Sequence, residues 1–150
     1  MSTQRPFGFT VAEALTALVA LVVVAAVAVP MWRTHELRMR REDAIAALLA
    51  VQTAQDQYFG KFARYANAIE LDATPPQGLG IKPLSKRGFY AIAVRNSADN
   101  LGYLATARVK PLDGNNPDTR CVEMRIDQNG RRFAADADGV DRSADCWRAD

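Results

Sequence analysis

The sequence predicts an α+β protein in which a long N-terminal helix packs on a small antiparallel β-sheet, with a disulfide-closed loop near the C-terminus. Three observations lead to this prediction. Residues 14–32 carry no charge and run directly into a segment of helical periodicity. Residues 89–134 contain short runs in which apolar and polar residues alternate, as in strands. The only two cysteines, Cys121 and Cys146, both lie near the C-terminus.

Length and charge limit the possibilities. A chain of 150 residues has room for one compact domain and an anchor, because domains usually contain about 100 to 150 residues. The formal net charge is +2, from 19 Lys and Arg against 17 Asp and Glu. Such a balance gives no strong field that would attract nucleic acid or anionic lipid in preference to other partners.

The N-terminal apolar segment is long enough to cross a membrane. Its uncharged part, residues 14–32, spans close to the roughly 30 Å of a bilayer's hydrocarbon core at 1.5 Å per helical residue. A buried helix of a soluble core is the alternative, but the run is apolar on all faces and lies beside Arg5 at the N-terminus. We therefore expect residues 9–32 to form a transmembrane or fibre-core helix.

Glu13 requires a partner, because a carboxylate costs on the order of 2.5 kcal/mol or more toward the centre of a bilayer. Cleavage between Gly8 and Phe9 would create an α-amino group one helical turn before Glu13. That amine could pair with the carboxylate within one subunit or between neighbours. The alternative is that Glu13 extends into the lipid headgroups without a specific role.

These residues carry a resemblance. The motif Gly8-Phe9-Thr10-Val11-Ala12-Glu13, followed by the apolar run and Pro30, resembles the N-terminus of type IV prepilins and of the related type II secretion pseudopilins. The resemblance implies that a prepilin peptidase removes leader residues 1–8 and methylates the amine of Phe9. It also implies that Glu13 sets the register of assembly and that Pro30 kinks the helix.

A different cleavage site is also present. Ala26-Val27-Ala28 has the small-x-small form of a secretory signal site after an apolar core. Cleavage there would release a soluble protein that starts at Val29 and would leave Glu13 without a role.

The orientation of the helix involves a conflict. Four arginines follow the apolar run, and the positive-inside rule would draw them toward the cytoplasm: Arg33, Arg38, Arg40 and Arg41. We nevertheless expect the head in the periplasm, because the family's peptidase acts on the cytoplasmic side and a cysteine pair suits an oxidising compartment.

Residues 33–62 predict an amphipathic helix. Apolar side chains recur there at steps of three or four residues: Leu37, Ala44, Leu48, Val51, Tyr58 and Phe62. Periodicity then fails, and prolines and glycines predict a loop over residues 63–87. The aromatic residues Tyr58, Phe59, Phe62 and Tyr65 could form a ligand platform, but their spacing favours packing of the helix end.

The rest of the head, within residues 63–150, predicts an antiparallel meander over residues 88–135. Strands are expected at 89–95, 103–109, 121–127 and 131–134, with turns at Asp99-Asn100 and Asn129-Gly130. A disulfide between Cys121 and Cys146 would close the tail 121–146, a loop of about 25 residues worth about 3.5 kcal/mol.

More narrowly, the C-terminal half is similar to that of the PilE-like minor pilins. The shared features are Cys121 at a strand onset, the Asn129-Gly130 turn and the ending Asp145-Cys146-Trp147-Arg148. The resemblance implies a pilin fold and a place among the low-abundance subunits of the complex that primes a pilus.

Few residues suggest chemistry. His35 is the sole histidine and has no cysteine or carboxylate cluster at ligand spacing, and no nucleophile or paired catalytic acid stands out. We predict no enzyme, cofactor or metal. Two minor alternatives are a calcium site at Asp136, Asp138, Asp141 and Asp145, and a DNA-contacting patch formed by Lys82, Lys86, Arg87, Arg131 and Arg132.

The sequence thus predicts an assembly subunit of a type IV pilus that supports pilus biogenesis, twitching motility and adhesion. Its expected partners are other pilin subunits, the prepilin peptidase, the inner-membrane assembly platform and the membrane, without nucleic acid. Before assembly it lies in the inner membrane with a periplasmic head, and afterwards in the extracellular pilus. The alternatives are a type II secretion pseudopilin and a membrane-anchored or secreted periplasmic binding module.

Overall fold

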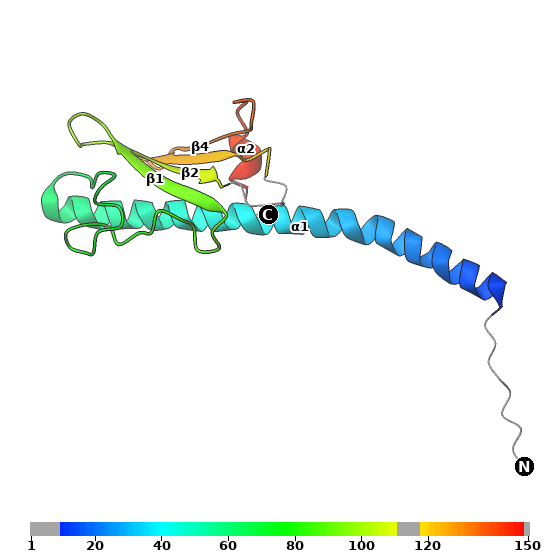
Figure 1. Ribbon diagram of the computed structural model, residues 1–150. Coiled ribbons are helices and arrows are strands. Elements are labelled where there is room, and N and C mark those ends of the chain that lie inside the picture. Colours follow the sequence, from blue (N-terminus) through cyan, green and yellow to red (C-terminus); the bar gives the residue numbers. More distant parts are fainter. Residues whose placement is uncertain (1–9, 111–117, 149–150) are drawn as a thin grey trace, which may run out of the picture. The chain divides into compact units, whose positions relative to one another are not determined.

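The computed structural model describes residues 10–110 and 118–148 (Figure 1). Its elements are helix α1 (Val11–Phe62), four strands and the short helix α2 (Ser143–Cys146). The chain forms two compact units, Met1–Glu36 and Leu37–Asp150, and α1 runs through both. The predicted α+β class, with a long N-terminal helix and a small antiparallel sheet, is confirmed.

The described part of the first unit is the apolar half of α1. Every residue between Thr16 and Pro30 is Ala, Leu or Val, so no side chain there needs a hydrogen-bond partner. None of its side chains is buried, and Val11 and Trp32 are 78% and 75% exposed. This half of the helix therefore presents an apolar surface on every side.

The second unit contains a four-stranded antiparallel sheet in the order β1-β2-β3-β4. The strands are β1 (Tyr90–Asn96), β2 (Tyr103–Val109), β3 (Glu123–Asp127) and β4 (Arg132–Ala135). All four overlap the strands that the sequence predicted, and β2 has the predicted bounds. β3 begins at Glu123, two residues later than expected, because the carboxylate of Asp118 engages the amide of Cys121 at 3.2 Å.

The turns of the meander use the residues that the sequence marked. Asn100 and Gly130 both have positive φ, +56° and +73°. Asn and Gly adopt this left-handed conformation most readily, which closes tight turns between antiparallel strands. The pairs Asn96 with Tyr103 and Ile126 with Arg132 then fix the register of the two hairpins.

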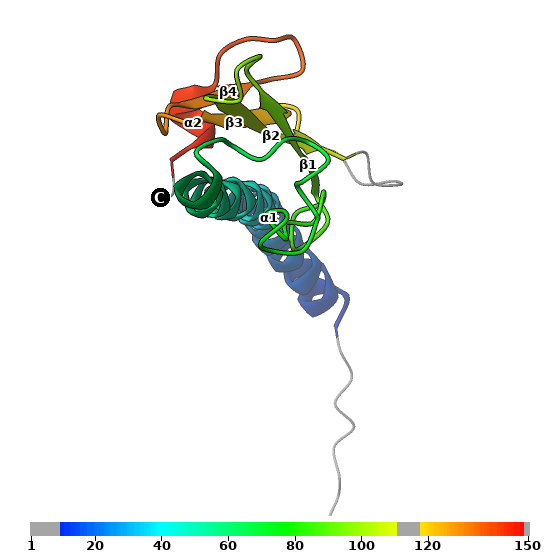
Figure 2. The ribbon, with the colours of Figure 1, turned by 90° about the vertical axis from the view of Figure 1, so that its left-hand side faces the viewer.

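The core lies between the second half of α1 and the inner face of the sheet (Figure 2). The helix buries Ala44, Leu48 and Val51, spaced so that they form one face. The sheet buries alternate residues of its strands: Tyr90, Ile92, Val94, Tyr103, Ala105, Ala107, Met124, Ile126 and Ala134. Small alanines opposite larger side chains allow helix and sheet to approach closely.

The segment between α1 and β1 wraps the end of the helix. Gln55 has no exposed surface, and its side-chain amide bonds both the N–H and the carbonyl of Ala66 at 2.8 Å. Arg64 donates to both carboxylate oxygens of Glu70, at 2.6 and 2.9 Å, and Tyr58 donates to the same carboxylate at 2.8 Å. These polar contacts fix the loop to the helix.

The aromatic residues at the end of α1 contact one another. Ring centroids lie 4.5 Å apart for Tyr58 and Phe62, and 4.7 Å apart for Phe59 and Tyr65. Tyr65 also meets Tyr103 of β2 at 4.8 Å. Tyr65 thus connects the end of the helix to the sheet, as the spacing indicated, while Phe59 and Phe62 stay 36% and 45% exposed.

Both outer strands are covered by flanking backbone. Along β1, Ser85 N donates to the carbonyl of Tyr90 and Ile92 N donates to that of Pro83, at 2.9 and 3.1 Å. Along β4, Arg142 N donates to the carbonyl of Ala134 at 2.8 Å, next to a bridge between Ala135 and Asp141. Neither edge of the sheet is left open along these residues.

Candidate functional site

The N-terminus of α1 is closed by a reciprocal pair of side chains. The carboxylate of Glu13 accepts hydrogen bonds from the amide nitrogen and the hydroxyl of Thr10, both at 2.9 Å. In return, the amide of Glu13 donates to the hydroxyl oxygen of Thr10 at 3.3 Å. This is a capping box, in which an N-cap Thr and an acid three residues later satisfy each other's backbone amides.

The role of Glu13 was predicted from the sequence, but that of Thr10 was not. The signal was present, because Thr-x-x-Glu before an apolar run is the sequence pattern of a capping box. The predicted partner of Glu13, the amine of a cleaved Phe9, lies outside the described residues, as does Gly8. Among the described residues, the hydrogen-bond partner of the Glu13 carboxylate is Thr10, at the start of the same helix.

The apolar half of α1 is the second part of the site. Among the described residues, α1 is the one helix long and apolar enough to cross a membrane, and no residue of its most apolar window is buried. Leu21 and Val24, in the middle of the run, are 70% and 66% exposed. A surface of this kind in water is strongly unfavourable, so it requires lipid or other apolar helices around it.

Pro30 lies inside α1, and the helix continues through it. Proline has no N–H, so the helix loses one backbone hydrogen bond at this position. The hydroxyl of Thr34 donates to the carbonyl of Pro30 at 2.9 Å one turn later. The kink expected at Pro30 stays a prediction.

At the other end of the sequence, a disulfide joins Cys121 to Cys146, as predicted, with Cα atoms 5.8 Å apart. It ties α2 to the segment that leads into β3. Asp118, whose side chain is 2% exposed, supports this junction. Its carboxylate accepts a hydrogen bond from Nη2 of Arg41 in α1 at 3.1 Å. It also accepts hydrogen bonds from the backbone amides of Arg120 and Cys121, at 3.1 and 3.2 Å.

The pair of Arg41 and Asp118 was not predicted from the sequence. The hydrogen bond to Asp118 raises the pKa of the Arg41 guanidinium, which therefore keeps its positive charge. The two residues lie 77 positions apart, and no local pattern connects them. Asp118 thus links helix, sheet and disulfide at one point.

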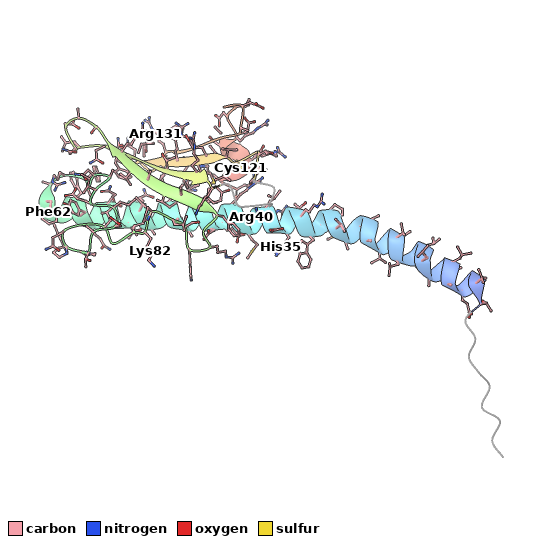
Figure 3. The ribbon with its side chains drawn as sticks, viewed as in Figure 1. His35, Arg40, Phe62, Lys82, Cys121 and Arg131 are labelled. Carbon is pink, nitrogen blue, oxygen red and sulfur yellow. A yellow bond between two sulfur atoms is a disulfide. The ribbon has the colours of Figure 1, made fainter. Side chains whose placement is uncertain are left out.

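The basic residues named as a minor alternative for DNA contact lie in two places. Lys82, Lys86 and Arg87 are exposed on the loop before β1, whereas Arg131 and Arg132 lie at the turn between β3 and β4. Lys82 and Arg131 lie on opposite sides of the second half of α1 (Figure 3). The five residues form two separate groups.

The aspartates of the tail serve turns. Asp136 accepts from the amides of Asp138 and Val140 and from Nε of Arg142, at 2.9 to 3.0 Å. Asp141 accepts from the amide and hydroxyl of Ser143. In the part of the chain that the structure describes, no three His, Cys, Asp or Glu side chains converge on a possible metal position.

An exposed apolar helix half, an acid at its first turn and a disulfide-tied sheet on its second half together define the class of the protein. The fold is that of a type IV pilin: it is similar to a type IV pilin from Shewanella oneidensis, with a TM-score of 0.50 and 20% sequence identity over 74% of this chain and 97% of that one. No curated protein sequence gives a significant match.

A family model identifies the group more closely. Residues 30–125 match the family described as "Type IV minor pilin ComP, DNA uptake sequence receptor", and this range covers more than half of the chain. The chain therefore belongs to this family of type IV minor pilins. The family and the fold are those of structural subunits of a pilus, which interact with other pilin subunits.

Proposed function

We propose that this chain is a minor subunit of a type IV pilus that is stored in the inner membrane with its head in the periplasm. The prepilin peptidase cuts between Gly8 and Phe9 and methylates the new amine, and an assembly platform then moves the subunit into the fibre. The observation that carries the proposal is the uncharged helical run of residues 14–32, with Glu13 directly before it and one turn after the expected cut.

Assembly then rests on two forces. Burial of apolar side chains against neighbouring helices stabilises the fibre core, at roughly 25 cal/mol per Å² of buried surface. Glu13 supplies specificity, because an unpaired carboxylate in that core is costly and a neighbouring amine removes the cost. In the uncleaved chain the carboxylate is engaged by Thr10, so the amine of Phe9 has to compete with the capping box.

Within the pilus, the minor subunit belongs to the complex that primes polymerisation and supports twitching motility and adhesion. The resemblance of Cys121, the Asn129-Gly130 turn and the C-terminal Cys146-Trp147 to PilE-like minor pilins supports this role. Loss of the gene should reduce the number of surface pili and twitching rather than block protein secretion. The reverse result would favour a type II secretion pseudopilin.

Substitution of Glu13 tests the proposal. Glu13→Ala leaves leader cleavage intact but abolishes incorporation, because the carboxylate that sets the register is gone. Asp72→Ala, which removes an exposed carboxylate of the head, is the matched control. The measurements are the intact mass of the mature protein and its amount in sheared pili. Normal amounts of Glu13→Ala in pili would refute the role of Glu13.

The first residue of the mature protein distinguishes the pilin pathway from the remaining alternative, a secreted binding module. A mass that corresponds to a start at Phe9 with one methyl group supports the pilin pathway. A start at Val29 would mean that a signal peptidase releases the head, and the chain would then be a secreted binding module.

Binding of DNA is a second candidate function, since the description of the matching family includes a DNA uptake sequence receptor. The basic group inside the matched range is Lys82, Lys86 and Arg87, exposed on the loop before β1. Each phosphate contact that is lost lowers the slope of log affinity against log salt by about 0.9. Replacing the three residues by Gln should therefore flatten this slope in a gel-shift titration with duplex DNA.

The matched control replaces Arg131 and Arg132, which lie outside the matched range at the turn between β3 and β4. Arg131 lies on the side of α1 opposite Lys82 (Figure 3). These two substitutions should leave the salt dependence of DNA binding unchanged. Equal loss in both variants would indicate non-specific attraction, and no binding by the wild type would remove this candidate.

A further inference from the structure

A basic pocket of about 200 Å³ lies in the head, where the first turns of its part of α1 meet the disulfide-tied tail. Its charged lining comes from both segments: Arg38, Arg41, Glu42, Arg120, Asp145 and Arg148. A water molecule occupies about 30 Å³ of liquid, so the pocket has room for a phosphate group and part of its ester.

Two of the four arginines are already paired. Arg41 is held by Asp118, and Arg120 donates to Asp145 at 3.1 Å. Arg38 and Arg148 are exposed and form no hydrogen bond or ion pair with any residue that the structure describes. Their guanidinium groups are free to bind a ligand.

The charge of the pocket matches a phosphodiester. Four arginines stand against the carboxylates of Glu42, Asp145 and Asp118, which leaves one net positive charge. A phosphodiester carries one negative charge. The planar fork of a guanidinium binds two phosphate oxygens at once, which makes arginine the preferred residue for such groups.

The sequence also limits how far this pocket can lie from a bilayer. Arg38 follows Trp32, the last residue of the uncharged run, by six positions. Six residues span at most about 20 Å even when fully extended. With the apolar run in the membrane, the backbone of Arg38 therefore lies no more than about 20 Å beyond the hydrocarbon core. The headgroup layer occupies about 5 to 8 Å of that distance.

We propose that this pocket binds the phosphate of an anionic phospholipid headgroup while the subunit is stored in the membrane. The inference rests on the proposed function, because it requires the apolar half of α1 to be in a bilayer. It also gives the arginines of this flank that line the pocket, Arg38 and Arg41, a role on the periplasmic side, since one bound lipid phosphate neutralises the net charge of the pocket. A zwitterionic lipid has no net charge to match that of the pocket, so the site prefers phosphatidylglycerol to phosphatidylcholine.

The test uses the full-length protein. It is reconstituted into nanodiscs with equal amounts of phosphatidylglycerol and phosphatidylcholine, transferred to mild detergent and examined by native mass spectrometry for retained lipid. The wild type should retain phosphatidylglycerol preferentially. In the double variant Arg38→Gln, Arg148→Gln, the preference for phosphatidylglycerol should fall about fivefold for each arginine removed. This factor corresponds to about 1 kcal/mol per basic residue at an anionic membrane.

The matched control is Arg95→Gln, Arg131→Gln, which removes two arginines that do not line the pocket and should keep the preference. Equal retention of the two lipids by the wild type, or an unchanged preference in the pocket variant, would overturn the inference. So would wild-type binding of free inorganic phosphate in detergent without preference between the lipids. Loss of duplex DNA binding in the pocket variant, with lipid retention unchanged, would assign the pocket to DNA instead.

Failure of this inference and failure of the proposed function are distinguishable. A wild-type chain that begins at Phe9 and enters pili, yet shows no lipid preference, refutes the lipid site alone. A mature chain that begins at Val29 removes the membrane-stored subunit itself.

Discussion

The carboxylate of Glu13 accepts two hydrogen bonds from Thr10, one from its amide and one from its hydroxyl, both at 2.9 Å. The acid that the apolar segment makes costly is therefore satisfied locally before any partner subunit is present. Under the proposed function, this arrangement would separate storage from assembly. Glu13 would cap its own helix during storage, and a partner amine would exist only after the proposed cut between Gly8 and Phe9.

Thr10→Val tests which partner Glu13 needs. The substitution keeps the shape of the side chain and removes the hydroxyl, at a cost of about 1 kcal/mol to the helix terminus. If Glu13 pairs with the amine of Phe9 in the fibre, the leader of the Thr10→Val variant is removed normally and the variant is still found in sheared pili. A loss of incorporation as complete as that of Glu13→Ala would show that the capping box, rather than the amine, is essential.

Asp118→Ala should strongly destabilise the head. The substitution leaves Arg41 without its buried partner, and loss of one member of a buried ion pair costs about 3 to 5 kcal/mol. Urea denaturation of the full-length protein in detergent, followed by tryptophan fluorescence, measures the free energy of unfolding. Asp138→Ala, an exposed aspartate of the tail, should change it by less than about 0.5 kcal/mol. Equal effects of the two variants would contradict the role of Asp118.

Replacing both Cys121 and Cys146 by Ser should lower the free energy of unfolding by about 3.5 kcal/mol, because the cross-link restricts a loop of 25 positions in the unfolded chain. The same urea titration measures the difference. Wild-type protein in a reducing agent should then unfold at the same urea concentration as the double variant. A reduced wild type that remains as stable as the oxidised form would rule out this contribution.

Glu70 should make stability depend on pH. Hydrogen bonds from Arg64 lower the pKa of this carboxyl from 4.5 to about 2. A carboxyl group whose pKa is lower in the folded than in the unfolded state stabilises the folded protein. This contribution is complete above the pKa of the unfolded state and is lost as the pH falls through the pKa of the folded state. The wild type should therefore lose stability between about pH 4.5 and 2.

Glu70→Gln should lack this part of the pH dependence, while Asp72→Asn, an exposed neighbour, should keep it. Thermal unfolding measured from pH 7 to pH 2 compares the three proteins. Parallel curves for the wild type and Glu70→Gln would show that Glu70 contributes nothing in this range.

Much of the fold could be predicted because its signals are local. The alternation at Tyr103–Val109 predicted a strand, and the Asn129-Gly130 pair predicted a turn with positive φ at Gly130. With only two cysteines in the chain, the disulfide had one possible pairing. In these cases a short stretch of sequence carries the physical reason for the structure.

The contacts that join distant segments could not be predicted in this way. Nothing in the residues around Arg41 indicates that its partner is Asp118, because the contact exists only after the sheet has packed on the helix. The pocket between Arg38 and Arg148 depends on the same packing. Thr10 differs from these, since its pairing with Glu13 is local and was overlooked.

The covered edges of the sheet have a consequence for polymerisation. A fibre brings many copies of the head close together, and an open strand edge at such density would recruit strands from neighbouring heads. Here the backbone of Pro83 and Ser85 pairs with Tyr90 and Ile92 at the start of β1, and Arg142 pairs with Ala134 of β4. These contacts oppose intermolecular β-sheet extension at those positions, which favours contacts between copies through the helices and disfavours amyloid-like association of the heads.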